Sequence, residues 1–236
     1  MSTTWPAALA GNGDMNGLKP AWDSVTTINV GKGFVCNDTT YDYIISSGVI
    51  SIDLTASGAG GLDTGSGAVD TWYYIWGIGD VENGTTSAMF SLSSTDPTMP
   101  GAYTLKRRIG EVRTDSSGDI LEFWMLSRAT LRRVYWLEDP ESVCQVLSNG
   151  TATTFTDVDC SSLCPPTARM MSLWVDSRVK DSHFKAKGGN HCQKHVDENR
   201  SETFDMLMDA NQVIQYEKTS SGGGVNISVA GYISGY

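Results

Sequence analysis

The stretch Thr71-Trp-Tyr-Tyr-Ile-Trp-Gly-Ile-Gly79 (TWYYIWGIG) decides the fold expected for this chain. Its aromatic and β-branched residues favour a β-strand. Four rings fall within the five residues from Trp72 to Trp76. Because successive side chains of a strand point to opposite faces, these rings occupy both faces of the sheet. We therefore expect a central strand that is covered on each side.

A glycine-rich segment precedes this strand. Thr55–Val69 (TASGAGGLDTGSGAV) has five glycines in fifteen residues, a density that allows positive φ angles and close backbone approach. It is not a phosphate-binding P-loop, since no Gly-Lys-Ser/Thr ends it. No helical pattern follows it. The segment is thus expected to serve the fold and not a nucleotide.

Strand patterns recur along the rest of the chain. Val25–Val30 and Val49–Leu54 alternate apolar and polar residues, as half-buried strands do. Asn149-Gly150 lies between apolar runs and predicts a hairpin. The polar, charged segment His191–Thr203 is expected to be an exposed loop or a short helix. About fifteen short strands predict an all-β, jelly-roll-like β-sandwich, one large or two small. The expected divisions are an N-terminal arm over 1–24, a first domain or half over 25–138 and a second over 139–236.

The first 24 residues lack any strand or helix period. They contain isolated apolar residues, among them Trp5 and Trp22, between glycines and prolines. Such segments often become ordered only against a partner. We expect an extended arm in which Trp5 and Trp22 are interface residues; a loose terminus is the alternative.

The charge of the chain is acidic but uneven. A net charge of −10 opposes binding to nucleic acid, so no nucleic-acid partner is expected. Seven of the 17 basic residues lie between Lys106 and Arg133. This basic strip, with Lys106, Arg107 and Arg108 at its start, is either a docking face for an acidic partner or an ordinary solvated surface.

Membrane association is not expected either. No apolar stretch approaches the roughly 20 residues that a membrane helix needs. The first residues, Met1-Ser-Thr-Thr-Trp-Pro, do not combine a basic start with an apolar run, so they do not resemble a signal peptide.

The five cysteines are an odd number, so at least one cannot pair within its own chain. Cys160, Cys164 and Cys192 are candidates for disulfide crosslinks within or between subunits. Together with His195 they also form a candidate zinc cluster of two short ligand groups, although the spacing matches none of the strong zinc patterns. The third alternative is that the cysteines are small buried apolar side chains, for which Cys144 is the best example.

No catalytic signature is found, and the chain is expected not to be an enzyme. Neither Gly-x-Ser-x-Gly nor His-Glu-x-x-His occurs. All three histidines fall between His183 and His195, and nothing marks a serine nucleophile beside them. No cofactor is expected.

An ordered series of motifs runs through residues 52–124 and continues near the end of the chain. In order, they are Ile52-Asp-Leu, Gly60-Gly-Leu-Asp-Thr-Gly, Asp70-Thr-Trp-Tyr-Tyr-Ile-Trp, Leu92-Ser-Ser-Thr with Pro97 and Pro100, Gly101-Ala-Tyr-Thr, Arg107-Arg-Ile-Gly, Arg113-Thr-Asp-Ser-Ser-Gly ahead of Phe123, Thr151-Ala-Thr-Thr-Phe-Thr-Asp-Val-Asp, Pro165-Pro-Thr-Ala-Arg and Asn226-Ile-Ser-Val-Ala-Gly-Tyr. This series resembles recurrent segments of fibre and virion-surface proteins of tailed bacteriophages. Cys160 and Cys164 depart from it, because that family usually carries apolar residues there.

The resemblance implies a β-sandwich, often a homotrimer, that is synthesised in the host cytoplasm and lies on the exterior of the virion. Its partners would be copies of itself and other virion proteins. Three functions follow as hypotheses: a structural or decoration subunit of the head, collar or tail fibre; a receptor-binding module whose exposed aromatic rings stack on host glycans; and a glycan-hydrolysing tailspike. The short chain disfavours the third, since a spike needs a long β-solenoid.

Overall fold

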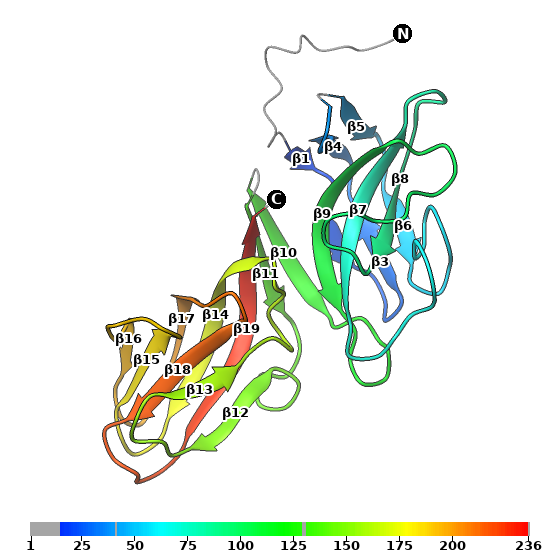
Figure 1. Cartoon of the computed structure of the whole chain (residues 1–236). Helices are drawn as coiled ribbons and strands as arrows, with labels where there is room; N and C mark the ends of the chain where they lie inside the picture. The colour runs from blue at the N-terminus through cyan, green and yellow to red at the C-terminus, as the bar shows by residue number, and fades with distance from the viewer. Residues whose placement is uncertain (1–14, 41, 129–130, 236) are drawn as a thin grey trace. The chain divides into compact units, whose positions relative to one another are not determined.

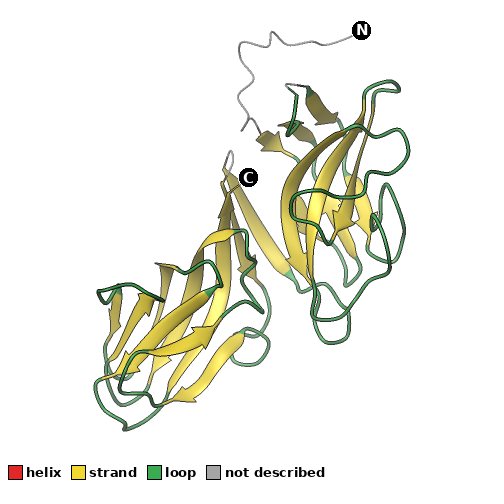
Figure 2. Cartoon of the chain, viewed as in Figure 1, coloured by secondary structure: helices red, strands yellow, loops and turns green. Residues whose placement is uncertain are grey.

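The computed structural model describes residues 15–40, 42–128 and 131–235. Over these residues the protein is all-β: nineteen strands and no helix, joined by loops and turns (Figures 1 and 2). The chain divides into two compact units, unit 1 up to Arg132 and unit 2 from Arg133 to Gly235. The boundary expected from the sequence lies after Glu138. The all-β prediction is confirmed.

Unit 1 contains three sheets of three strands each, with orders β1-β4-β5, β2-β3-β6 and β8-β7-β9. Their strands, together with β10, are β1 (Met15–Gly17), β2 (Pro20–Trp22), β3 (Thr27–Val30), β4 (Gly33–Cys36), β5 (Tyr43–Ser46), β6 (Ile50–Asp53), β7 (Trp72–Asp80), β8 (Thr85–Ser91), β9 (Leu105–Arg113) and β10 (Phe123–Arg128).

Strand β7 is the aromatic strand, and it lies between β8 and β9 as expected. Every residue from Tyr73 to Asp80 is buried. Tyr73 and Trp76 are three positions apart, so their side chains face opposite sides of the sheet. Both are nevertheless buried, at 0% and 1% exposed. A register shift between Ile75 and Trp76 interrupts the pairing with β9. The prediction of a central, doubly covered strand is confirmed.

The glycine-rich segment follows the edge of β8. The Gly60 and Phe90 amides donate to Ala88 and Gly61 carbonyls, both at 2.8 Å. Gly60 has a φ of +88°, and a Cβ on Gly61 would lie 2.4 Å from the Ala56 carbonyl. Both properties expected of the glycines, positive φ and close backbone approach, are therefore used here.

The predicted arm is corrected over its second half. Residues 15–22 form β1 and β2, which pair with β4 and β3, and Leu18 between them is 1% exposed. The error arose because strands of three residues are too short to display a period. Residues 1–14, which include Trp5, lie outside the described residues.

Unit 2 is built on a large and a smaller sheet. Within this unit the large sheet has the order β11-β19-β14-β17, with β12 also paired to β19, and the smaller sheet is β13-β18-β15-β16. The strands of this half of the chain are β11 (Leu131–Trp136), β12 (Gln145–Gly150), β13 (Thr156–Asp159), β14 (Ala168–Ser177), β15 (Ser182–Ala186), β16 (Lys194–Val196), β17 (Arg200–Leu207), β18 (Val213–Lys218) and β19 (Val225–Gly235).

Two local predictions in unit 2 are wrong. Asn149-Gly150 does not turn a hairpin; it ends β12, which pairs with the distant β19. The segment His191–Thr203 contains β16 and the first half of β17, where only Val196 is buried. In both places long-range pairing determines the structure and local composition does not.

Candidate functional site

The basic strip begins on β9 in unit 1, where its side chains have partners within the unit. Lys106 forms an ion pair with Asp96. Arg107 Nη1 lies 2.8 Å from Asp38 Oδ1, and Arg108 Nη1 donates to the Ser94 carbonyl at 3.2 Å. These internal contacts reduce the positive charge that the strip offers to an outside partner.

A hollow of about 300 Å³ opens beside these cations, lined by Asp38, Trp76, Ser94, Thr95, Arg107 and Arg108. Lys106 Nζ lies 5.9 Å from the centre of the Trp76 ring. The indole is 1% exposed and donates to the Ser93 carbonyl at 3.1 Å. The hollow therefore offers guanidinium and hydroxyl groups but little open ring surface for stacking.

The strip does not continue as a surface to its end. Arg132 is fully buried and donates to the carbonyls of Leu18 and Gly17, both at 3.1 Å. Arg133 forms an ion pair with Asp205. Arg132 thus stabilises the start of the described chain and is not a docking residue.

Trp22, the other interface candidate, is half-buried. Its Nε1 donates to the Ile120 carbonyl at 3.0 Å. The side chain contributes to packing within unit 1.

The five cysteines all lie in the part of the chain that the structure describes, and none of them forms a disulfide within the chain. Cys160 and Cys164 are buried, whereas Cys192 is exposed. Burial raises the pKa of Cys160 to about 12, with the Asp159 charge as a smaller cause. Cys164 Sγ lies 3.4 Å from Met208 Sδ, and Cys192 Sγ lies 2.9 Å from the Lys194 carbonyl oxygen.

The structure does not bring the candidate zinc ligands together. Among the described residues, the one group of three or more potential metal ligands consists of Asp181, His195 and Asp197. This group shares only His195 with the predicted cluster. Its other two members are carboxylates, and none of the three predicted thiols belongs to it.

Strand pairing produces this group. In the register of β15 and β16, Ser182 lies opposite Val196, and His183 lies opposite His195. Ser182 and Val196 are fully buried. Since side chains alternate along a strand, the residues next to these two, including Asp181 before β15 and Asp197 after β16, lie on the outer face.

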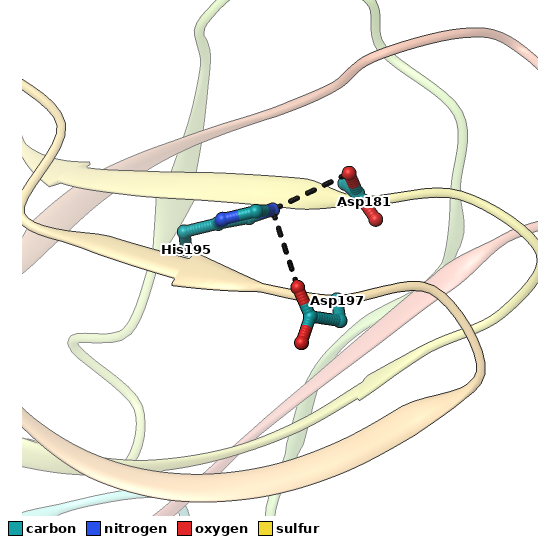
Figure 3. A group of neighbouring side chains, drawn as sticks. All are labelled: Asp181, His195 and Asp197. Atoms are coloured by element: carbon teal, nitrogen blue, oxygen red, sulfur yellow. Dashed lines mark ion pairs between the residues drawn. The ribbon is translucent and has the colours of Figure 1, made fainter.

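The His195 imidazole points between the two carboxylates (Figure 3). Its Nε2 lies 3.4 Å from Asp181 Oδ2 and 3.8 Å from Asp197 Oδ1. The His183 ring lies beside it with centroids 5.0 Å apart, and His183 Nδ1 is 3.3 Å from Glu217 Oε1. The outer face of this sheet edge is a row of imidazoles and carboxylates.

Sequence reasoning missed both aspartates of the group. The sequence contains Asp181-x-His183 and, in the reverse order, His195-x-Asp197. In each motif the middle residue is buried and the two polar residues beside it face outward. Recognising the group required that the second motif be read as a strand and that the register of the pair be known.

No protein-family model matches this chain, and no curated protein shows significant sequence similarity to it. Among residues 15–40, 42–128 and 131–235, no helix is long and apolar enough to span a membrane.

Proposed function

We propose that this protein is a non-enzymatic structural subunit on the exterior of a tailed-phage particle, as a head decoration, collar or tail-fibre component. Its partners are copies of itself, as a homotrimer, and other virion proteins. The proposal joins the resemblance of the sequence to the all-β architecture of both units.

The observation that carries this proposal is the place of the resembling motifs in unit 1. Asp70-Thr-Trp-Tyr-Tyr-Ile-Trp supplies most of the buried central strand β7. Arg107-Arg-Ile-Gly lies on its neighbour β9. Arg113-Thr-Asp-Ser-Ser-Gly contains a turn in which the Asp115 carbonyl accepts from the Gly118 amide at 3.1 Å. The shared motifs thus build the scaffold, which favours a structural module over a shared active site.

We also propose that each unit is a β-sandwich. In unit 2, Phe184 of the smaller sheet contacts Phe204 of the large sheet, with ring centroids 5.6 Å apart. In unit 1, Ile44 of β5 packs against Gly79 of β7, where an added Cβ would lie 3.4 Å from Ile44 Cγ1. Side chains that interlock between sheets are typical of sandwich cores.

A receptor-binding module is the second candidate, supported by the hollow beside Trp76. Its arginines and hydroxyl groups are suited to binding a polar, acidic glycan. The burial of Trp76 weakens this candidate, because stacking on a sugar needs an open ring face. Trp124 on β10, 51% exposed, is the described tryptophan with the most accessible ring.

Analysis of purified particles tests the proposal. We expect the chain to copurify with intact particles at a fixed stoichiometry and to be digested by protease added from outside. A chain found only in the lysate, outside particles, would contradict a structural role. Binding of host polysaccharide that is lost in Arg108→Ala, with particles still assembled, would favour the receptor-binding candidate.

A further inference from the structure

We propose that Asp181, His195 and Asp197 form a site for a divalent transition-metal ion of the zinc class. The site lies on the outer face of the β15–β16 edge in unit 2 (Figure 3). It does not depend on the function proposed above.

The distances between the ligand atoms match this coordination. Zinc bonds of 2.0–2.2 Å in a tetrahedron separate neighbouring ligand atoms by roughly 3.3–3.6 Å. His195 Nε2 lies 3.4 Å from Asp181 Oδ2 and 3.8 Å from Asp197 Oδ1, and all three ligand atoms lie within 4.8 Å of one another. All three side chains lie at the surface, so rotation of the carboxylates can bring their oxygens to the tetrahedral separations.

Each carboxylate is oriented through its other oxygen. Asp181 Oδ1 accepts a hydrogen bond from the Glu198 amide at 2.9 Å, and this contact directs Oδ2 toward His195. Asp197 Oδ2 lies 3.8 Å from Arg200 Nε, while Oδ1 faces the imidazole. Such outer contacts are the way in which proteins fix metal ligands.

The donor set selects the class of ion. One imidazole nitrogen with two carboxylate oxygens suits zinc and its first-row neighbours, whereas calcium and magnesium prefer sites made of oxygen alone. Three protein ligands leave a coordination position open on the solvent side. The ion would tie the turn before β15 to the turn after β16.

Titration calorimetry of the full chain with zinc chloride tests the site. We expect about one ion per chain, and at least tenfold weaker binding for His195→Gln and for Asp197→Asn. The matched controls are His191→Gln, which removes another exposed histidine of the same polar segment, and Cys192→Ser; both should bind as the native chain does.

Cobalt provides a second readout that separates these ligands from thiolates. With cobalt(II) in place of zinc we expect visible d–d bands but no strong near-ultraviolet charge-transfer band, because no sulfur coordinates the ion. The proposal is overturned if the native chain binds no zinc, if His195→Gln binds it unchanged, or if a strong thiolate charge-transfer band appears and is lost in Cys192→Ser.

Discussion

Trp76 is the single side chain on which the core of unit 1 depends most. It is 1% exposed and forms a buried cluster with Tyr74, Ile78 and Met89. Trp76→Ala leaves a large cavity and removes the donor to the Ser93 carbonyl. We expect a loss of about 3–5 kcal/mol in the free energy of unfolding, measured by urea denaturation.

Trp124→Ala is the matched control for this substitution, because the same side chain is removed from a half-exposed position. A surface substitution of this kind should change stability far less. Equal losses for the two variants would refute the assignment of Trp76 to the core.

The thiols are expected to differ in reactivity. Only the thiolate attacks an alkylating reagent, and burial raises the pKa of Cys144 to about 12, with smaller contributions from Glu138 and Asp139. Cys192 alone among the five is exposed. We expect one rapidly labelled thiol per native chain, detected by mass spectrometry, and its loss in Cys192→Ser. Rapid labelling that persists in this variant would contradict the structure.

Non-reducing electrophoresis of particles tests whether the exposed Cys192 forms a disulfide crosslink between subunits. With no disulfide inside the chain, a bond to another subunit remains a prediction, and Cys192 is the accessible candidate. Any reducible dimer should therefore disappear in Cys192→Ser.

The burial of a single side chain could be predicted from the sequence where local composition alone decides it. The rings of β7 are of this kind, since four aromatic side chains in five residues cannot all face water. The aspartates beside His195 are not, because a carboxylate near a histidine in sequence is common and only the register of β15 and β16 places them together.

Among the elements, the β7–β8 connection is held by one carboxylate. Asp80 Oδ1 accepts from the amides of Glu82 and Asn83, and Oδ2 accepts from Asn83 Nδ2 at 2.7 Å. These hydrogen bonds, led by that of the Asn83 side chain, lower the pKa of Asp80 below its ordinary 3.8.

A lowered carboxyl pKa stabilises the fold above the unfolded value, and this stabilisation is lost as the pH falls through the folded value. Asp80→Asn should therefore be less stable than the native chain at pH 7. The difference should shrink as the pH falls below 3.8. Urea midpoints of both chains across this range provide the measurement, and a difference that is independent of pH would assign the effect to something other than the ionised carboxylate.

Strands were predictable where they are long and rich in aromatic and β-branched residues, as β7 is. The short strands β1, β2 and β16, each of three residues, were not, because three residues cannot display an alternation. Asn149-Gly150 shows the opposite error: its local turn propensity was strong, yet β12 finds its partner in β19, far along the chain.

At the level of the chain, the corrected start of unit 1 changes what truncation should do. A chain that begins at Val25 lacks β1 and β2, buried Leu18, and the carbonyls that accept from Arg132. We expect it to unfold at a clearly lower urea concentration, since burying a leucine side chain alone contributes about 1.5–3 kcal/mol. A chain that begins at Met15 is the control and should unfold as the full chain does. Equal stability of both truncated chains would restore the arm as it was first predicted.

The all-β class follows from the abundance of strand patterns and turns, whereas the division into two units and the place where one unit ends do not. The boundary lies inside β11 (Leu131–Trp136), and a continuous strand carries no break in composition that would mark it.

Electron microscopy of intact particles, labelled with an antibody against this chain, tests the proposed function most directly. Particles should come from the cells in which the protein is naturally made, and an antibody against an internal particle protein is the control. We expect label on the outside of unbroken particles at regular, symmetry-related positions. Particles that bear no label, or that bind the antibody only after disruption, would contradict a structural role on the particle exterior.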